Sequence, residues 1–258
     1  MLAFSSLLGN VEGQNIYRIW YDKPASYWEE ALPVGNGRIA AMEFGNPQLE
    51  QIQLNEETVS AGSPYQNYNE EAKTALPEMR RLIFEGKYEE AQNMAATKIL
   101  SQVGNEMPYQ TVGRLNIRYP DHKKVNNYYR DLDISNAVAV TRYEVDGVEF
   151  TEETFASFTD QLVIRHIKAS KPGTINCELF FNTPMRDPKR SIYGKKGLRL
   201  EGITHGSRYF SGKVHYCADL DVKHKGGKVI TANDTLLSVQ GASELTFYIS
   251  METKFVNY

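Results

Sequence analysis

The sequence predicts a mainly β protein, built as one large antiparallel β-sandwich (a supersandwich) with a short two-helix insertion at about residues 70–100. Short runs with alternating or β-branched apolar residues recur at intervals of about ten residues after that insertion. Tyrosine and phenylalanine, which favour strands, occur 16 and 11 times. Only one stretch lacks these features, so we expect the helices to be confined to it.

That stretch, residues 68–100, has no β-branched runs and is rich in Ala, Glu, Met, Leu and Arg. Its apolar residues recur at helical spacings. We expect Pro77 in the first turn of one helix and Gly86 at its end, in a left-handed conformation. A second helix should then cover residues 87–97.

Alternating patterns predict the strands that follow the insertion. They cover residues 115–119, 137–145, 148–156, 161–169, 174–182 and 246–251. The clearest hairpin spans residues 140–155, because Asp146-Gly147 is a two-residue turn that tolerates positive φ. Further turns are expected at Gly173, at Gly226-Gly227 and at Gly241. No repeat or linker divides the chain, so residues 14–258 are predicted to form one domain.

The first 13 residues contain a short apolar run followed by Val11-Glu12-Gly13, which is similar to a signal-peptidase site. No basic segment precedes the run. We interpret residues 1–13 as the remnant of a signal peptide, with Gln14 as the mature start. This interpretation predicts a periplasmic or extracellular protein; a frayed terminal segment is the alternative.

Composition excludes some classes of partner. The 29 basic and 32 acidic side chains give a net charge of only -3, so a nucleic-acid partner is not expected. No run approaches the roughly 20 apolar residues of a membrane-spanning helix, so no membrane span is expected either.

Neither a metal site nor a cofactor is expected. Cys177 and Cys217 each fall in a β-like stretch without metal-ligand spacing. The histidines are scattered without pairing; they are His122, His166, His205, His215 and His224. For the two cysteines, a disulfide between them and two free thiols both remain open.

The common catalytic motifs are missing from the sequence: there is no nucleophile elbow, metal-binding histidine pair or phosphate loop. Residues 35–38 (GNGR) predict a tight turn between strands. Adjacent acidic residues are frequent but point apart on a strand, whereas glycoside hydrolysis needs two carboxyl groups that face each other at roughly 5–9.5 Å. The best single candidate is Glu56, directly after a strand expected at residues 51–54. A loop hydrogen bond is the alternative role for Glu56.

Large aromatic residues cluster near the N-terminus. Trp20, Tyr21 and Trp28 could stack on a sugar through their rings. Packing of the first strand and its loop is the alternative explanation.

Three blocks in order resemble the opening of glycoside hydrolase family 95. They are residues 19–25 (IWYDKPA), 28–38 (WEEALPVGNGR) and 53–58 (QLNEET). Shorter matches continue through residues 76–80, 86–91, 109–110, 129–133 and 155–157. The family is best known for inverting α-L-fucosidases, and some members act on α-L-galactosides. The resemblance implies a large N-terminal β-sandwich followed by a catalytic (α/α)6 barrel.

Because the family's catalytic residues lie in the barrel, the resemblance implies no catalytic residue here and no activity of this chain alone. The last residues, 255–258, resemble the segment that leads toward the barrel. The resemblance gives supporting roles, facing the barrel or next to the substrate, to five residues: Trp28, Asn36, Arg38, Asn55 and Glu56. A fucosylated oligosaccharide is the implied ligand of the whole enzyme.

The chain also departs from the family pattern. Ser60 stands where the family usually has Trp, Ala40 where it has Gly, and Glu43 where it has an apolar residue. Arg114 stands where Asp is usual. These departures indicate a divergent member.

Together these observations favour the non-catalytic N-terminal domain of an exported α-L-fucosidase-like hydrolase. One alternative is a free-standing carbohydrate-binding module, which predicts an exposed aromatic platform containing Trp28 and several tyrosines. Another is a structural interaction domain, which predicts an exposed apolar patch instead.

Overall fold

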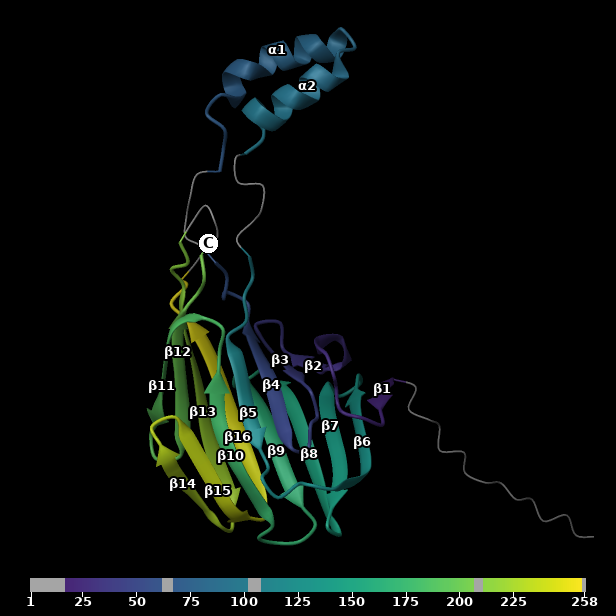
Figure 1. Ribbon diagram of the computed structural model, residues 1–258, viewed down its shortest axis with the longest axis vertical. Coiled ribbons are helices and arrows are strands. Elements are labelled where there is room, and N and C mark those ends of the chain that lie inside the picture. The colour runs from purple at the N-terminus through teal and green to yellow at the C-terminus, as the bar shows by residue number, and fades with distance from the viewer. Residues whose placement is uncertain (1–16, 62–66, 102–107, 207–210, 257–258) are drawn as a thin grey trace, which may run out of the picture.

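The computed structural model describes residues 17–61, 67–101, 108–206 and 211–256. Two antiparallel sheets form a sandwich, and a pair of helices projects beyond one end of it (Figure 1). This architecture confirms the predicted fold class, including the position of the helical insertion.

The larger sheet has nine strands. In spatial order they are β1 (Arg18–Tyr21), β6 (Val125–Asp133), β7 (Val138–Val145), β8 (Val148–Ser157), β9 (Leu162–Ala169), β16 (Glu244–Thr253), β13 (His215–Lys225), β12 (Gly197–Ile203) and β11 (Arg186–Tyr193). The last long strand of the chain, β16, is thus inserted between β9 and β13, near the middle of the sheet.

The smaller sheet has seven strands. They are β14 (Lys228–Asn233), β15 (Leu236–Ala242), β10 (Ile175–Asn182), β5 (Gly113–Arg118), β4 (Leu49–Glu56), β3 (Ile39–Glu43) and β2 (Leu32–Gly35). The six strands predicted after the insertion and the one predicted at residues 51–54 are all present in the two sheets, with ends that differ from the prediction by two residues or fewer.

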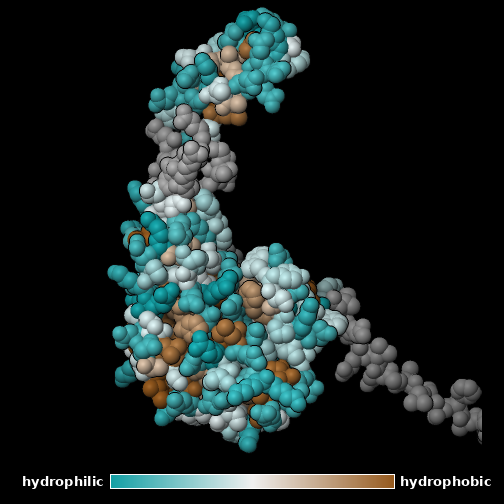
Figure 2. Space-filling view, viewed as in Figure 1, coloured by the Kyte–Doolittle hydropathy of each residue, from teal (hydrophilic) through white to brown (hydrophobic). Residues whose placement is uncertain are grey.

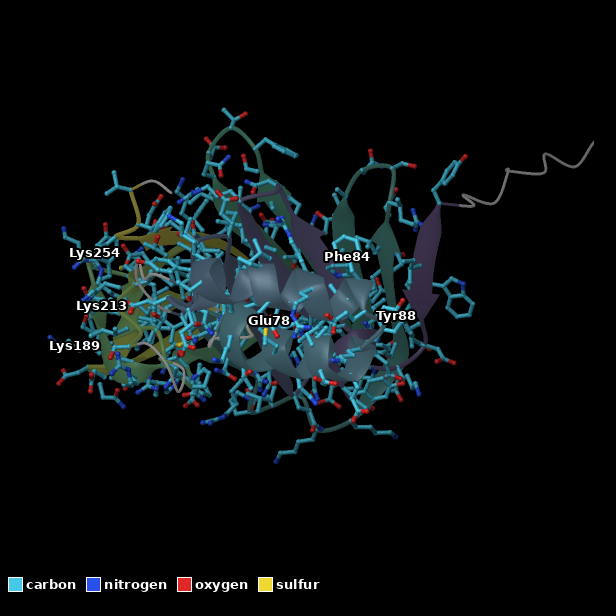
Figure 3. All side chains as sticks on the ribbon, turned by 90° about the horizontal axis from the view of Figure 1, so that it is seen from above. Glu78, Phe84, Tyr88, Lys189, Lys213 and Lys254 are labelled. Carbon is cyan, nitrogen blue, oxygen red and sulfur yellow. The ribbon has the colours of Figure 1, made fainter. Side chains whose placement is uncertain are left out.

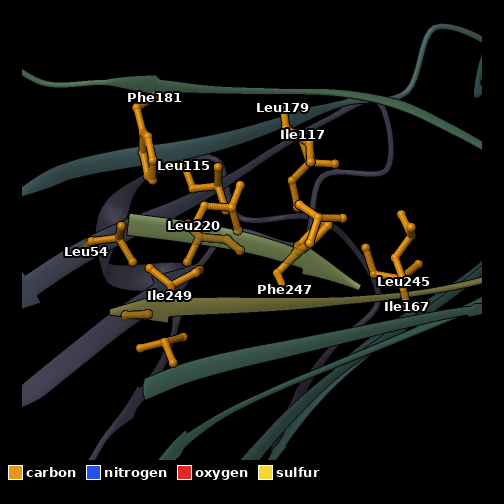
Figure 4. Close-up of a cluster of buried hydrophobic side chains, with 14 of the residues drawn as sticks. Leu54, Leu115, Ile117, Ile167, Leu179, Phe181, Leu220, Leu245, Phe247 and Ile249 are labelled. Atoms are coloured by element: carbon orange, nitrogen blue, oxygen red, sulfur yellow. The ribbon is translucent and has the colours of Figure 1, made fainter. Parts of the chain in front are cut away.

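Alternating side chains from both sheets build the core. Figure 4 shows Leu54, Leu115 and Phe181 of the smaller sheet packed toward Phe247 and Ile249 of the larger one, and all five are at most 2% exposed. Burying an apolar side chain of this size stabilises the fold by roughly 1.5–3 kcal/mol. The period-2 pattern that predicted the strands therefore also determined their inner faces.

The predicted hairpin between β7 and β8 is confirmed. Val145 pairs with Val148, which leaves Asp146 and Gly147 as the two turn residues. Both have positive φ, 49° and 75°, as a type I′ turn requires.

The helical insertion contains α1 (Ala72–Phe84), α2 (Tyr88–Met94) and a π-helical turn, η2 (Ala95–Ile99). Gly86 ends α1 with φ 74°, as predicted. The expected place of Pro77 was wrong, because α1 begins five residues before it and Pro77 lies inside the helix. Asn69 starts the helix earlier: its side-chain oxygen accepts the Glu71 N–H and its carbonyl accepts the Ala72 N–H.

The two helices bury only small parts of their surface against each other. Ala75, Leu82 and Ala91 are buried, whereas Phe84 is 88% exposed and Tyr88 69% exposed near the turn between the helices. Seen along the long axis in Figure 3, the helices lie over the end of the sandwich with Phe84 and Tyr88 at one side. None of the described helices is long and apolar enough to cross a membrane.

The two cysteines do not form the disulfide that the sequence left open. Cys177 lies in β10 and faces the core, whereas Cys217 lies in β13 of the other sheet, on a face turned away from the core. Both are free thiols.

One predicted turn was also wrong. Gly241 lies inside β15, where its positive φ of 67° accompanies a register shift between β15 and β10. The signal-peptide interpretation of residues 1–13 lies outside the described residues.

Candidate functional site

Four of the five predicted supporting residues come from two neighbouring strand ends. Asn36 and Arg38 belong to the turn between β2 and β3, and Asn55 and Glu56 end β4. Because Ile39 pairs with Glu56, and the Glu57 N–H donates to the Arg38 carbonyl at 2.9 Å, the two segments lie side by side.

Asn36 holds the turn together. Its side-chain oxygen accepts the backbone N–H groups of Arg38 and Ile39 at 3.1 and 3.0 Å. Its amide nitrogen donates to the Ser157 carbonyl at 2.8 Å and to the Gln161 side chain at 3.2 Å. The residue therefore fixes the β2–β3 turn against the turn between β8 and β9.

Arg38 connects the two sheets at this end of the sandwich. Its Nη2 lies 2.6 Å from Oε2 of Glu252, on β16, and donates to the Met251 carbonyl at 3.1 Å. Its Nε lies 3.6 Å from Oε1 of Glu56, on β4. One guanidinium thus bridges carboxylates from both sheets.

Glu56 is almost fully buried and has further partners. Its Oε2 accepts the backbone N–H of Thr58 at 2.8 Å and the Thr58 hydroxyl at 2.6 Å. The same hydroxyl contacts the hydroxyl of Thr253 on β16. Glu56 thus makes loop hydrogen bonds, which was the alternative role considered for it from the sequence. We call Arg38, Glu56, Thr58, Glu252 and Thr253 the sandwich-end cluster.

A shallow pocket of about 340 Å³ opens beside the sandwich-end cluster, and Glu57, Phe255 and Val256 complete its lining. Glu56 and Glu252 both border this pocket, but the Arg38 guanidinium contacts both carboxylates. Both carboxylates pair with Arg38, and that of Glu56 also accepts two hydrogen bonds from Thr58. The cluster therefore offers ion pairing and loop positioning rather than a free acid and base.

Asn55 and Trp28 are not brought into this cluster. Side chains alternate along β4, so Asn55 points to the opposite face from Glu56. Its Oδ1 atom is buried and has no hydrogen-bond partner among the described residues. Trp28 lies in the 3-10 turn η1 (Trp28–Glu30) and is about half exposed.

Sequence reasoning missed Tyr109 at this end of the molecule. Tyr109 forms an isolated bridge with Ser60, and its hydroxyl donates to the Glu56 carbonyl at 3.1 Å. Partial burial raises the pKa of its hydroxyl, and the carboxylates of Glu56 and Glu57 add to the rise. The match at residues 109–110 was the signal that could have pointed to it, whereas nothing local identified Glu252 or Thr253.

A second group of charges lies inside the sandwich. Arg165, on β9, pairs with Glu43 of β3 at 2.8 Å and with Glu152 of β8. Glu50, on β4, is also fully buried. Burial is the main reason why its pKa is raised to about 8; Arg165 opposes this rise, and the carboxylates of Glu43 and Glu152 add to it. We call these four residues the core ion cluster. Since all four are buried, the cluster has no access for a substrate.

Comparison with known proteins gives a consistent result. The family model described as "Glycosyl hydrolase family 65, N-terminal domain" matches residues 19–258. The chain is 37% identical to "Alpha-L-fucosidase 2" of Arabidopsis thaliana over 271 aligned positions, which cover 95% of this chain and 31% of the plant protein.

Two fungal proteins are more distant. "Probable alpha-fucosidase A" of Aspergillus niger is 26% identical, covering 59% of this chain and 20% of that protein. The protein of the same description from Aspergillus oryzae is 25% identical, covering 64% and 23%. The chain thus spans about a third or less of the length of these relatives. The resemblance to α-L-fucosidases inferred from the sequence is confirmed, although the matching family model bears the description of family 65.

Proposed function

Because the chain belongs to the family of glycosyl hydrolase family 65 N-terminal domains and is related to α-L-fucosidase 2, we propose that it is the non-catalytic part of an enzyme that hydrolyses terminal α-L-fucosyl or related α-L-galactosyl linkages. Its role is to support a C-terminal catalytic barrel and the mouth of the active site. We also propose that the whole enzyme is exported, on the basis of the apolar run at residues 1–13.

The sandwich-end cluster is the observation that carries this proposal. It ties the ends of β4 and β16 together through Arg38, at the pocket lined by Phe255 and Val256. The helical pair projects from the same end of the sandwich (Figure 1). A strand end tied by ion pairs, with the exposed Val256 beside it, is suited to adjoin a further domain.

A chimera tests the proposal. The segment of Arabidopsis α-L-fucosidase 2 that matches this chain is replaced by it, and release of fucose from an aryl α-L-fucoside is measured. We expect hydrolysis by the chimera and none by this chain alone. Turnover by the isolated chain would contradict the non-catalytic role.

The supporting role needs a separate comparison. The remaining part of the plant enzyme, without any N-terminal domain, is assayed beside the chimera and beside a chimera with Arg38→Ala. We expect the truncated enzyme to be inactive or insoluble and the Arg38→Ala chimera to be weakened. If the truncated enzyme matches the chimera in activity and stability, the supporting role is refuted.

A further inference from the structure

Trp20 and Tyr129 form an aromatic pair on the outer face of the nine-stranded sheet. Their ring centroids lie 6.3 Å apart and the rings are inclined by only 19°. Trp20 is 61% exposed, because it lies on β1 at the edge of the sheet. Its neighbour Tyr21 points the other way and lies under the Arg130 guanidinium, 4.1 Å from it.

A groove of about 320 Å³ lies on the Tyr129 side of this pair, with Tyr129 in its lining. Its volume is at the lower end of the range for small-ligand sites. Tyr129 pairs with Arg142, and Arg142 pairs with Thr151, so these side chains form a row across β6, β7 and β8. The other residues that line the groove are Asn127, Tyr143, Glu144, Glu149 and Phe150.

Some of the polar groups at the groove are held in place before any ligand binds. Asp131 is buried next to the aromatic pair, with Oδ2 lying 3.0 Å from Arg18 and 3.9 Å from Arg142. Asn127 donates to Glu144 at 2.9 Å. Such preorganisation reduces the conformational entropy that these side chains lose on binding.

The chemistry of the groove matches a pyranose sugar. A pyranose has an apolar C–H face, which an exposed indole can cover, and a rim of hydroxyls that both donate and accept hydrogen bonds. Arg142 and Asn127 supply donors, and Glu144 and Glu149 supply acceptors. With two carboxylates and one guanidinium on the groove, a phosphate or a uronic acid would be repelled.

We propose that Trp20, Tyr129 and this groove form a binding site for a neutral oligosaccharide, separate from the sandwich-end cluster. Trp20 stacks on one sugar ring, and Arg142 and Glu144 bind hydroxyls of the next. The site requires neither a catalytic domain nor any hydrolysis. It would keep the protein on a glycan surface.

Two variants of the whole chain give an optical test, because Trp20 and Trp28 are its two tryptophans. Trp28→Phe leaves Trp20 as the reporter, and Trp20→Phe leaves Trp28 as the matched control. Each is titrated with cellotetraose, xylotetraose, maltotetraose and 2′-fucosyllactose. We expect a saturable fluorescence change with at least one sugar in Trp28→Phe and no change in Trp20→Phe.

Calorimetry then measures the contribution of each residue. Trp20→Ala should weaken binding about tenfold or more, the loss expected for an aromatic anchor. Trp20→Phe should retain binding, because a ring remains, and a thermal melt establishes that each variant is folded. Absence of a saturable change with all four sugars would overturn the proposal. So would unchanged affinity in Trp20→Ala, or a Trp20 signal that depends on protein concentration alone and thus reports self-association.

Discussion

Arg165 and Glu43 form an ion pair between the two sheets of the sandwich, with Nη1 of Arg165 lying 2.8 Å from Oε1 of Glu43. Both side chains are at most 1% exposed. Thr141 also donates to Glu43, at 3.1 Å. The acidic residue at position 43 therefore has a structural role as a partner of a buried arginine.

Substituting Glu43 by alanine should destabilise the fold strongly. Removing one member of a buried ion pair leaves the other charge less compensated and typically costs about 3–5 kcal/mol. Urea denaturation measures the free energy of unfolding. The control is Glu78→Ala, which removes an exposed ion pair with Arg81 in α1 and should change little. Equal losses in the two variants would contradict a special role for the Arg165–Glu43 pair.

Stability should decrease as the pH rises from about 5 to 8.5. In the folded protein the pKa of Glu50 is raised to about 8 by burial, whereas in the unfolded chain it returns to its ordinary value near 4.5. The folded state therefore holds a proton that the unfolded state has lost, and this contribution is fully present below pH 4.5 and disappears as the pH passes 8. Thermal melts across this range measure the effect.

Glu50→Gln provides the control for this pH dependence, because glutamine has no proton to lose. Its melting temperature should be lower at every pH, because the substitution perturbs the hydrogen bonds that Glu50 accepts from the backbone N–H groups of Phe44 and Asn46. The slope between pH 5 and 8.5 should nevertheless flatten. An unchanged slope in this variant would assign the pH dependence to other groups.

Arg38→Met should loosen the junction between β4 and β16. The variant loses the ion pair with Glu252 and the hydrogen bond to the Met251 carbonyl, a cost of about 1–2 kcal/mol. Hydrogen exchange should accelerate at residues 253–255, while the β7–β8 hairpin keeps its protection. Uniform acceleration throughout the sandwich would instead indicate a global effect.

Both cysteines should remain reduced and differ in accessibility. Burial raises the pKa of both thiols, and Cys177 is only 2% exposed. Native alkylation followed by mass spectrometry should label Cys217 slowly and leave Cys177 unlabelled until the protein unfolds. A mass two hydrogens lower than that of the fully reduced chain would reveal the disulfide that the structure does not contain.

The sequence predicted well those features that depend on neighbouring residues. Alternation located six strands, Asp146-Gly147 located a tight turn, and Gly86 located the end of a helix. The sequence-based prediction failed where one local signal was outweighed by another upstream. Pro77 suggested a helix start, but Asn69 had already formed the first hydrogen bonds upstream.

The candidate site could be predicted only in part. Asn36, Arg38, Asn55 and Glu56 were predicted through a resemblance. Alternation along β4 nevertheless separates Asn55 from Glu56. Glu252 could not be identified, because it is more than two hundred residues from Arg38 along the chain, and only the pairing order of the larger sheet brings β16 to this end.

By itself, the sequence determined the fold class, the inner face of each predicted strand and the relationship to α-L-fucosidases, because periodicity and motifs are properties of short segments. The tertiary structure alone decided which charges meet: Arg165 with Glu43, and Arg38 with Glu252. It also decided that Trp20 faces water while Tyr21 faces inward. The physical reason is that an ion pair or an exposed ring depends on which distant strands become neighbours, and burial of the whole core selects that arrangement.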